Sequence, residues 1–167
     1  MRRFCIAGII KNEEKTIPWF LENIAFLKKF GLSGISWVDT GSRDRTCEVV
    51  RSYQNKYTVP IRLYHEPFVD YGTSRTVAMR LSDVGVPWIM VLDPDELLLE
   101  TECGPLASML ETDTELWYVR RKKWGDLAMT DQREKYAYPD WQCRLARNLP
   151  HVCYHGRVHE MIKSKTF

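Results

Sequence analysis

The sequence predicts an α/β fold: a single domain, spanning residues 1–167, built on a mixed, mostly parallel sheet flanked by helices. The length of 167 residues suits one domain with a sizeable core. Hydrophobic residues make up 44% of the chain and charged residues 28%, as in globular proteins. Apolar runs alternate with helix-like segments over the first hundred residues, a pattern typical of parallel strands joined by right-handed crossovers.

The first two elements are expected to be a strand and a helix. Residues 4–10 form a continuous apolar run, which indicates a strand covered on both faces. Apolar residues then recur at helical spacing: Ile17, Phe20, Leu21, Ile24 and Leu27. We expect Asn12 to cap this helix, Glu13 and Glu14 to suit its positive end, and Gly31 to stop it.

Three further strands are expected at residues 34–39, 61–66 and 87–93. The segments between them, residues 40–57 and 70–83, have the composition and spacing of a turn with a helix and of a helix. The first hundred residues are therefore typical of a nucleotide-binding α/β unit.

The pattern changes after residue 100, where an antiparallel-leaning half is expected. A short helix at 105–111 is followed by an alternating segment at 116–124, which predicts a strand. Residues 125–140 lack a clear period and are expected to form a loop. Residues 141–147 and 151–161 are each expected to form one strand.

Charge and cysteine content exclude several classes. Lys and Arg number 24 against 22 Asp and Glu, and the net charge of +2 argues against a nucleic-acid binder. The short basic runs at 120–123 and 144–148 are interpreted as solvated faces. No apolar stretch approaches 18 residues, so no membrane span is predicted. Five cysteines without framework spacing fit free thiols in a reducing compartment, and we expect a cytoplasmic protein.

Polar residues follow each predicted parallel strand, at 11–14, 39–46, 65–75 and 93–96. In open α/β sheets, ligands bind outside the carboxyl ends of the strands. Asp39 has two interpretations: a cap or turn residue, or an acceptor of hydrogen bonds from a base or ribose. The turn after it lacks the glycine patterns of dinucleotide and phosphate loops, which excludes an obvious dehydrogenase or P-loop enzyme.

The segment 91–96, VLDPDE, ends an apolar strand with three carboxylates in four positions. Desolvating like charges is costly unless a positive charge compensates. Asp93 and Asp95 therefore indicate a hard divalent cation such as Mn²⁺ or Mg²⁺, which prefers carboxylate and phosphate oxygens. The alternative is an ordinary acidic loop.

The segment YHGRVHEM, residues 154–161, also carries chemistry. In a strand, alternation would place four side chains on one face: Cys153, His155, Arg157 and His159. His159 suits a further metal ligand, Glu160 a general base, and Arg157 a contact to phosphate, a sugar carboxylate or a hydroxyl. The alternative is a polar edge strand.

Two weaker signals lie nearby. A zinc site is disfavoured, because the spacing of its four candidate ligands does not match known pairs: Cys143, His151, Cys153 and His155. Trp124, Tyr136 and Tyr138 flank the aperiodic loop, where rings can stack on a sugar, although core packing is the default explanation.

Six stretches together resemble a known family: IIKNEEKTIPWFLEN, VDTGSRDRT, FVDYGTSRTVAM, WIMVLDPDELL, WQCRLARN and GRVHE. In order and spacing, across about residues 4–161, they are similar to the family 2 glycosyltransferases of the Rossmann-like GT-A fold. The resemblance implies inverting transfer of a sugar from a nucleotide-sugar to an acceptor hydroxyl with Mn²⁺ or Mg²⁺. A UDP-sugar is the favoured donor, with GDP- and dTDP-sugars as alternatives, and the acceptor is a glycan, a lipid-linked molecule or a protein.

The resemblance also implies roles for individual residues. Asn12, Glu13 and Asp39 would line the base and ribose pocket, and Arg75 would contact the nucleotide. Asp93 and Asp95 would form the D-x-D motif, with Asp95 on the metal and Asp93 nearer the ribose or a metal-bound water. His159 would complete the metal or diphosphate site, and Glu160 would be the base, with Asp140 in reserve.

The chain departs from this family at two points. Thr76 stands where many relatives have Asn, and only six residues follow Met161, where relatives continue with an acceptor-binding region. We therefore expect a piece of a longer enzyme, with residues 1–100 binding the nucleotide-sugar and residues 101–167 completing the metal and acceptor sites. The alternatives are a nucleotidyltransferase, disfavoured by the acidic residues after the first strand, and a non-catalytic sugar- or nucleotide-binding module.

Overall fold

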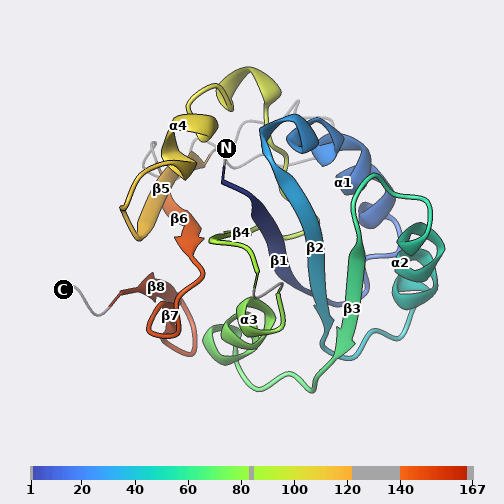
Figure 1. Cartoon of the computed structure of the whole chain (residues 1–167). Helices are drawn as coiled ribbons and strands as arrows, with labels where there is room; N and C mark the ends of the chain where they lie inside the picture. The colour runs from blue at the N-terminus through green and yellow to red at the C-terminus, as the bar shows by residue number, and fades with distance from the viewer. Residues whose placement is uncertain (1, 83–84, 122–139, 165–167) are drawn as a thin grey trace.

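Six strands form one mixed sheet in the order β3-β2-β1-β4-β6-β5 (Figure 1). The computed structural model describes residues 2–82, 85–121 and 140–164. The strands are β1 Phe4–Ile10, β2 Leu32–Asp39, β3 Ile61–His65, β4 Trp88–Val91, β5 Leu116–Arg121 and β6 Asp140–Arg147. β1 to β4 pair in parallel, whereas β6 runs antiparallel to both β4 and β5. The predicted mixed, mostly parallel sheet is confirmed.

The helices follow the predicted segments. They are α1 Thr16–Ile24, α2 Thr46–Gln54, α3 Tyr71–Arg80 and α4 Leu106–Leu110, with 3-10 turns η1 Ala25–Phe30 and η2 Glu100–Glu102. Gly31 ends η1 in the left-handed region at φ 97°, as predicted. The predicted cap at Asn12 is wrong: Lys15 occupies the N-cap position of α1 without a side-chain bond. The Asn12 Oδ1 instead accepts a hydrogen bond from the Arg43 amide.

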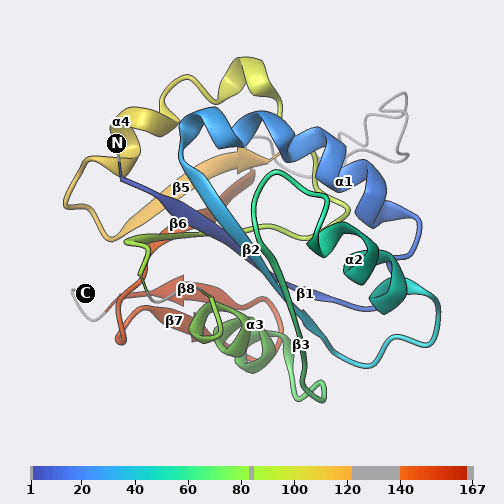
Figure 2. The same cartoon turned by 45° about the vertical axis from the view of Figure 1, so that its right-hand side comes forward.

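Apolar residues cover both faces of the sheet, as the continuous apolar strands predict. Figure 2 shows α1 and α2 on one side of the sheet and, on the other, α3 with the hairpin of β7 Cys153–His155 and β8 Met161–Lys163. The larger core packs Phe20 and Ile17 of α1 against Trp37 of β2. The smaller core contains Met79 of α3 and Ile162 of β8. Burial on both faces fixes where each strand ends, and hence where the loops that carry polar residues meet.

The segment 151–161 corrects the prediction of a single strand. It contains β7 Cys153–His155, which turns back to pair antiparallel with β8 Met161–Lys163. The turn requires left-handed backbone at Gly156, φ 99°, and at His159, φ 55°. The predicted alternation of side chains therefore stops at His155, and Arg157 and His159 do not lie on a strand face.

Other predictions have mixed outcomes. All five cysteines are free thiols. Within the described ranges, no helix has the length and apolar character needed to cross a bilayer. Trp124, Tyr136 and Tyr138 lie outside the described residues.

Candidate functional site

The loops that follow β1 and β2 are joined by hydrogen bonds. The Asn12 amide donates to Ser42 Oγ at 2.9 Å, and the Arg43 amide donates back to Asn12 Oδ1 at 2.8 Å. The Glu13 amide donates to Thr46 Oγ1 at 2.6 Å. These bonds hold two of the predicted polar segments side by side at the carboxyl edge of the sheet. The backbone of Asn12 lies in the left-handed region, at φ 58°, which Asn tolerates better than most residues do.

Asp39 is a buried turn residue at the end of β2. Its carboxylate accepts hydrogen bonds from the amides of Gly41 and Ser42 and from Ser42 Oγ. Burial raises the pKa of Asp39, but these hydrogen bonds outweigh burial and lower the pKa below its ordinary value. The turn interpretation is confirmed, and the contact to a base or ribose stays a prediction.

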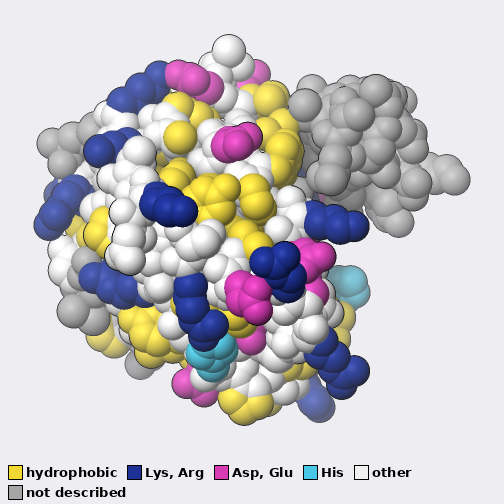
Figure 3. Space-filling view, turned by 90° about the vertical axis from the view of Figure 1, so that its right-hand side faces the viewer, with side chains coloured by type: hydrophobic (Ala, Val, Ile, Leu, Met, Phe, Trp, Pro, Cys, Tyr) yellow, Lys and Arg dark blue, Asp and Glu magenta, His cyan; other side chains and the backbone are white. Residues whose placement is uncertain are grey.

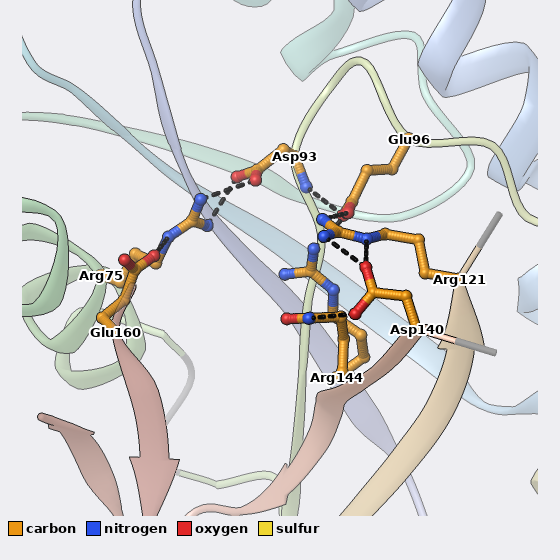
Figure 4. Close-up of polar contacts among 8 residues, drawn as sticks. Arg75, Asp93, Glu96, Arg121, Asp140, Arg144 and Glu160 are labelled. Atoms are coloured by element: carbon orange, nitrogen blue, oxygen red, sulfur yellow. Dashed lines mark hydrogen bonds and ion pairs between the residues drawn. The ribbon is translucent and has the colours of Figure 1, made fainter. Parts of the chain in front are cut away.

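Arg75 joins two of the predicted acids (Figure 4). Its NH1 and NH2 donate to the two oxygens of Asp93 at 2.6 Å each, and its Nε donates to Glu160 Oε1 at 2.9 Å. Burial favours neutral Arg75, but the bonds and charge of Asp93 outweigh it and raise the pKa of the guanidinium. The carboxylates after β4 are thus partly compensated by a cation of the chain itself.

A second network ties the same segment to the antiparallel strands. Glu96, whose Oε2 accepts from the Asp93 amide at 3.1 Å, is bonded to the guanidinium of Arg144. Arg121 donates to Asp140 Oδ2 at 3.0 and 2.7 Å and lies 3.9 Å from Glu96. Burial outweighs Arg144 and raises the pKa of Glu96. The basic runs predicted solvated faces for these residues, but Arg121 and Arg144 pair instead with the half-buried acids Glu96 and Asp140.

Asp95 and His159 remain open to solvent. Asp95 is exposed, and no hydrogen bond or ion pair joins its carboxylate to another residue of the described ranges. His159 is also exposed. Among the described non-glycine residues, His159 and Asn12 have a positive φ. The free carboxylate and diphosphate oxygens fit Mn²⁺ or Mg²⁺, and the exposed imidazole is available as a further ligand. Both oxygens of Asp93 are taken by Arg75, which suits its predicted position beside the metal.

Two other groups of predicted residues lie apart from the Arg75 network. The Arg157 side chain is 87% exposed, and its Nε lies 3.9 Å from Asp70 Oδ2. Of the disfavoured zinc set, His151 Nε2 lies 3.0 Å from Glu115. Among the described residues, neither this set nor Asp93, Asp95 and His159 forms a close cluster of metal-ligating atoms.

Sequence reasoning missed Glu96, Arg121 and Arg144. A signal was present in β6, where alternation places Asp140, Gln142 and Arg144 on one face. Gln142 Nε2 donates to Asp140 Oδ1 at 2.9 Å, which supports that arrangement. The partner of Arg144 comes from a different segment, so its ion pair required the fold.

Comparisons with known proteins identify the family and support the fold. The sequence pattern of glycosyl transferase family 2 matches residues 5–160. No curated protein sequence matches the chain.

Several solved structures share the fold. S. aureus TarS 1-349 in complex with UDP has a TM-score of 0.58 at 18% identity, covering 87% of this chain and 47% of TarS 1-349. The mannosyltransferase PcManGT from Pyrobaculum calidifontis, in complex with GDP-Man and Mn²⁺, has a TM-score of 0.57 at 21% identity, covering 72% of this chain and 36% of the enzyme. The chain thus spans less than half the length of these structures.

Proposed function

The chain belongs to glycosyl transferase family 2, and we propose that it transfers a sugar from a nucleoside-diphosphate sugar to an acceptor hydroxyl, with inversion at the anomeric carbon. One observation carries the proposal: Arg75 binds Asp93 after β4 and Glu160 before β8 in a single contact network. It lies at the edge where open α/β sheets bind ligands. The complexes of TarS with UDP and UDP-GlcNAc support a UDP-sugar donor, and that of PcManGT keeps a GDP-sugar as an alternative.

The loops after β1 and β2 are proposed to hold the base and ribose. Asn12, Glu13 and Asp39 lie on these joined loops, and their positions are fixed by bonds to the 42–46 turn. Arg75 holds the Asp93 carboxylate in one orientation, where it can accept a bond from a ribose hydroxyl or a metal-bound water. Preset polar groups of this kind reduce the ordering cost of binding.

Asp95 and His159 are proposed to hold the Mn²⁺ or Mg²⁺. When bound, such an ion neutralises charge that develops on the departing diphosphate. Asp95 suits this role because its carboxylate is exposed and has no partner within the described ranges. Arg157, 87% exposed, is proposed to contact phosphate only after it leaves Asp70.

Glu160 is the favoured base, because only one of its oxygens has a bond from Arg75. Asp140 accepts bonds on both oxygens, from Arg121 and Gln142, which leaves it less free to take a proton. The base removes the proton of the acceptor hydroxyl as that oxygen attacks the anomeric carbon, a contribution of roughly 10²–10⁴-fold in rate. Residues 101–167 would thus supply the acceptor side.

The first test is the thermal stability of the protein with UDP, GDP, dTDP, CDP and ADP, each with and without Mn²⁺. A nucleotide at a hundredfold excess over its dissociation constant stabilises the folded state by about 2.7 kcal/mol, or roughly 5–11 °C in Tm for a chain of this size. We expect a Mn²⁺-dependent rise with one base, UDP by preference. No rise with any nucleotide would reject the donor site.

A further inference from the structure

A second group of metal-ligating side chains lies beside the proposed donor site. It consists of Asp39 at the end of β2, Cys47 in the first turn of α2 and His65 at the end of β3, with ligand atoms that all lie within 4.8 Å of one another. On the face shown in Figure 3, histidine side chains lie in the lower half, among acidic and basic side chains. We propose that these three residues bind a thiophilic divalent ion such as Zn²⁺, separately from the ion at Asp95, and that this ion blocks the donor nucleotide.

The distances suit zinc after small side-chain rotations. Tetrahedral zinc holds S, N and O ligands at about 2.0–2.3 Å, which places the ligand atoms roughly 3.3–3.7 Å apart. His65 Nδ1 and Asp39 Oδ2 already lie 3.5 Å apart. The His65 side chain is 52% exposed, so it can turn toward an ion once its hydrogen bond with Arg51 breaks.

The chemistry of the ligands separates this site from the Mn²⁺ or Mg²⁺ site. A thiolate favours Zn²⁺ over the hard ions Mn²⁺ and Mg²⁺, which prefer oxygen. Burial and then the negative charge of Asp39 raise the pKa of the Cys47 thiol, so the free protein keeps its proton. The ion replaces this proton, which passes to solvent, and the positive end of α2 favours the thiolate formed. The amides of Gly41 and Ser42 already orient the Asp39 carboxylate.

The guanidinium of Arg51 competes with an ion for the His65 imidazole, and this competition provides a test of the metal site. Its NH2 lies 3.2 Å from His65 Nε2, an arrangement in which Nε2 accepts and Nδ1 carries the ring proton. When Nδ1 binds a metal, Nε2 takes the ring proton, and the bond from Arg51 must break. Removing the Arg51 charge should therefore tighten metal binding, whereas a residue with a merely structural role would have no such effect.

The consequence for the enzyme rests on the proposed function. Asp39 is the carboxylate proposed to receive the base or ribose of the donor. The Asp39 carboxylate already accepts bonds from two amides and from the Ser42 hydroxyl, which leaves too little room for both ligands, so Zn²⁺ and nucleotide should exclude each other.

The test uses Co²⁺ and Zn²⁺ alone, without nucleotide, in a thiol-free buffer. Thiolate-to-cobalt charge-transfer absorption reports the Cys47 bond, and calorimetry gives the Zn²⁺ affinity. We expect one ion per chain, no absorption in Cys47→Ser, at least tenfold weaker Zn²⁺ binding in His65→Gln, and tighter binding in Arg51→Gln. Cys103→Ser is the matched control and should bind as the wild type does.

Two results would overturn the site: absorption that persists in Cys47→Ser, or absorption lost in Cys153→Ser. The latter would locate the ion at the other close pair, where Cys153 Sγ lies 3.5 Å from His155 Nε2. His65→Gln changes an exposed side chain and keeps the test valid if Cys47→Ser fails to fold.

Competition between Zn²⁺ and UDP is tested in a separate measurement. Zn²⁺ should weaken Mn²⁺-dependent UDP binding at least tenfold in the wild type and not in His65→Gln. Equal weakening in both proteins would refute the competition. If UDP fails to bind the wild type without Zn²⁺, the donor proposal is wrong, and the metal site is still decided by the cobalt spectrum.

Discussion

Replacing Arg75 with Met should destabilise the fold strongly, because it leaves two acids without their shared cation. Arg75 is 9% exposed, and the side chains of Asp93 and Glu160 are 22% and 16% exposed. Removing one partner of a buried ion pair costs about 3–5 kcal/mol. Because both acids keep some contact with solvent, the lower figure of about 3 kcal/mol applies, equivalent to a fall in Tm of about 6–12 °C for a chain of this size.

The assay is thermal unfolding at neutral pH, followed by circular dichroism. Asp93→Asn added to Arg75→Met removes one of the stranded charges and should recover part of the lost stability. Arg45→Met is the matched control: Arg45 is 76% exposed, pairs with Glu48 on the helix surface, and should leave Tm unchanged. A Tm for Arg75→Met within about 2 °C of the wild type would refute the compensation argument.

Three further predictions concern packing, pH and catalysis. Gly72→Ala should lower the free energy of unfolding, measured in urea, by about 1–3 kcal/mol, because the added Cβ would clash with a backbone carbonyl of the β7–β8 turn. Gly104→Ala is the control, since a Cβ there has nothing within 4 Å and should not destabilise the protein. Equal effects of the two substitutions would contradict this packing. Burial, followed by neighbouring carboxylates, raises the pKa of Glu13 above its ordinary value of 4.5. The charged Glu13 carboxylate therefore destabilises the fold at pH values above the raised pKa, and this destabilisation is absent at pH values below the ordinary pKa. Glu13→Gln should therefore raise Tm at about pH 7.5 and not at about pH 4, and a rise at both would count against a titration effect. Glu160→Gln should lower the rate of sugar transfer by roughly 10²–10⁴-fold, and a larger loss in Asp140→Asn would reverse the assignment of the base.

The positions of the first four strands along the chain could be predicted, because apolar runs and helical spacing are local properties. The runs at residues 4–10, 34–39, 61–66 and 87–93 became β1 to β4 with small shifts at the ends. The prediction of a single strand at residues 151–161 was wrong because it relied on the alternation of side chains alone. Gly156 adopts φ 99° there, and a glycine inside a strand pattern is a signal for a break in the strand that outweighs the alternation.

The ion pairs could not be predicted, since each depends on contacts between distant segments. Arg121 meets Asp140 because the two are register partners of β5 and β6. Arg75 reaches Glu160 because the hairpin turn packs against the start of α3, where the Tyr71 amide donates to the Arg157 carbonyl at 3.3 Å. Asp93 and Glu96 have compensating positive charges, as the sequence indicates for this segment, but arginines supply them.

Binding of Mn²⁺ at Asp95 together with a nucleoside diphosphate is the central feature of the proposed donor site. Electron paramagnetic resonance of Mn²⁺ with UDP measures this without an acceptor. The wild type should bind one Mn²⁺ in the presence of UDP, and Asp95→Ala should lose it while keeping Tm within about 2 °C, since Asp95 is exposed. Equal Mn²⁺ binding by the two proteins would contradict the assignment of the site.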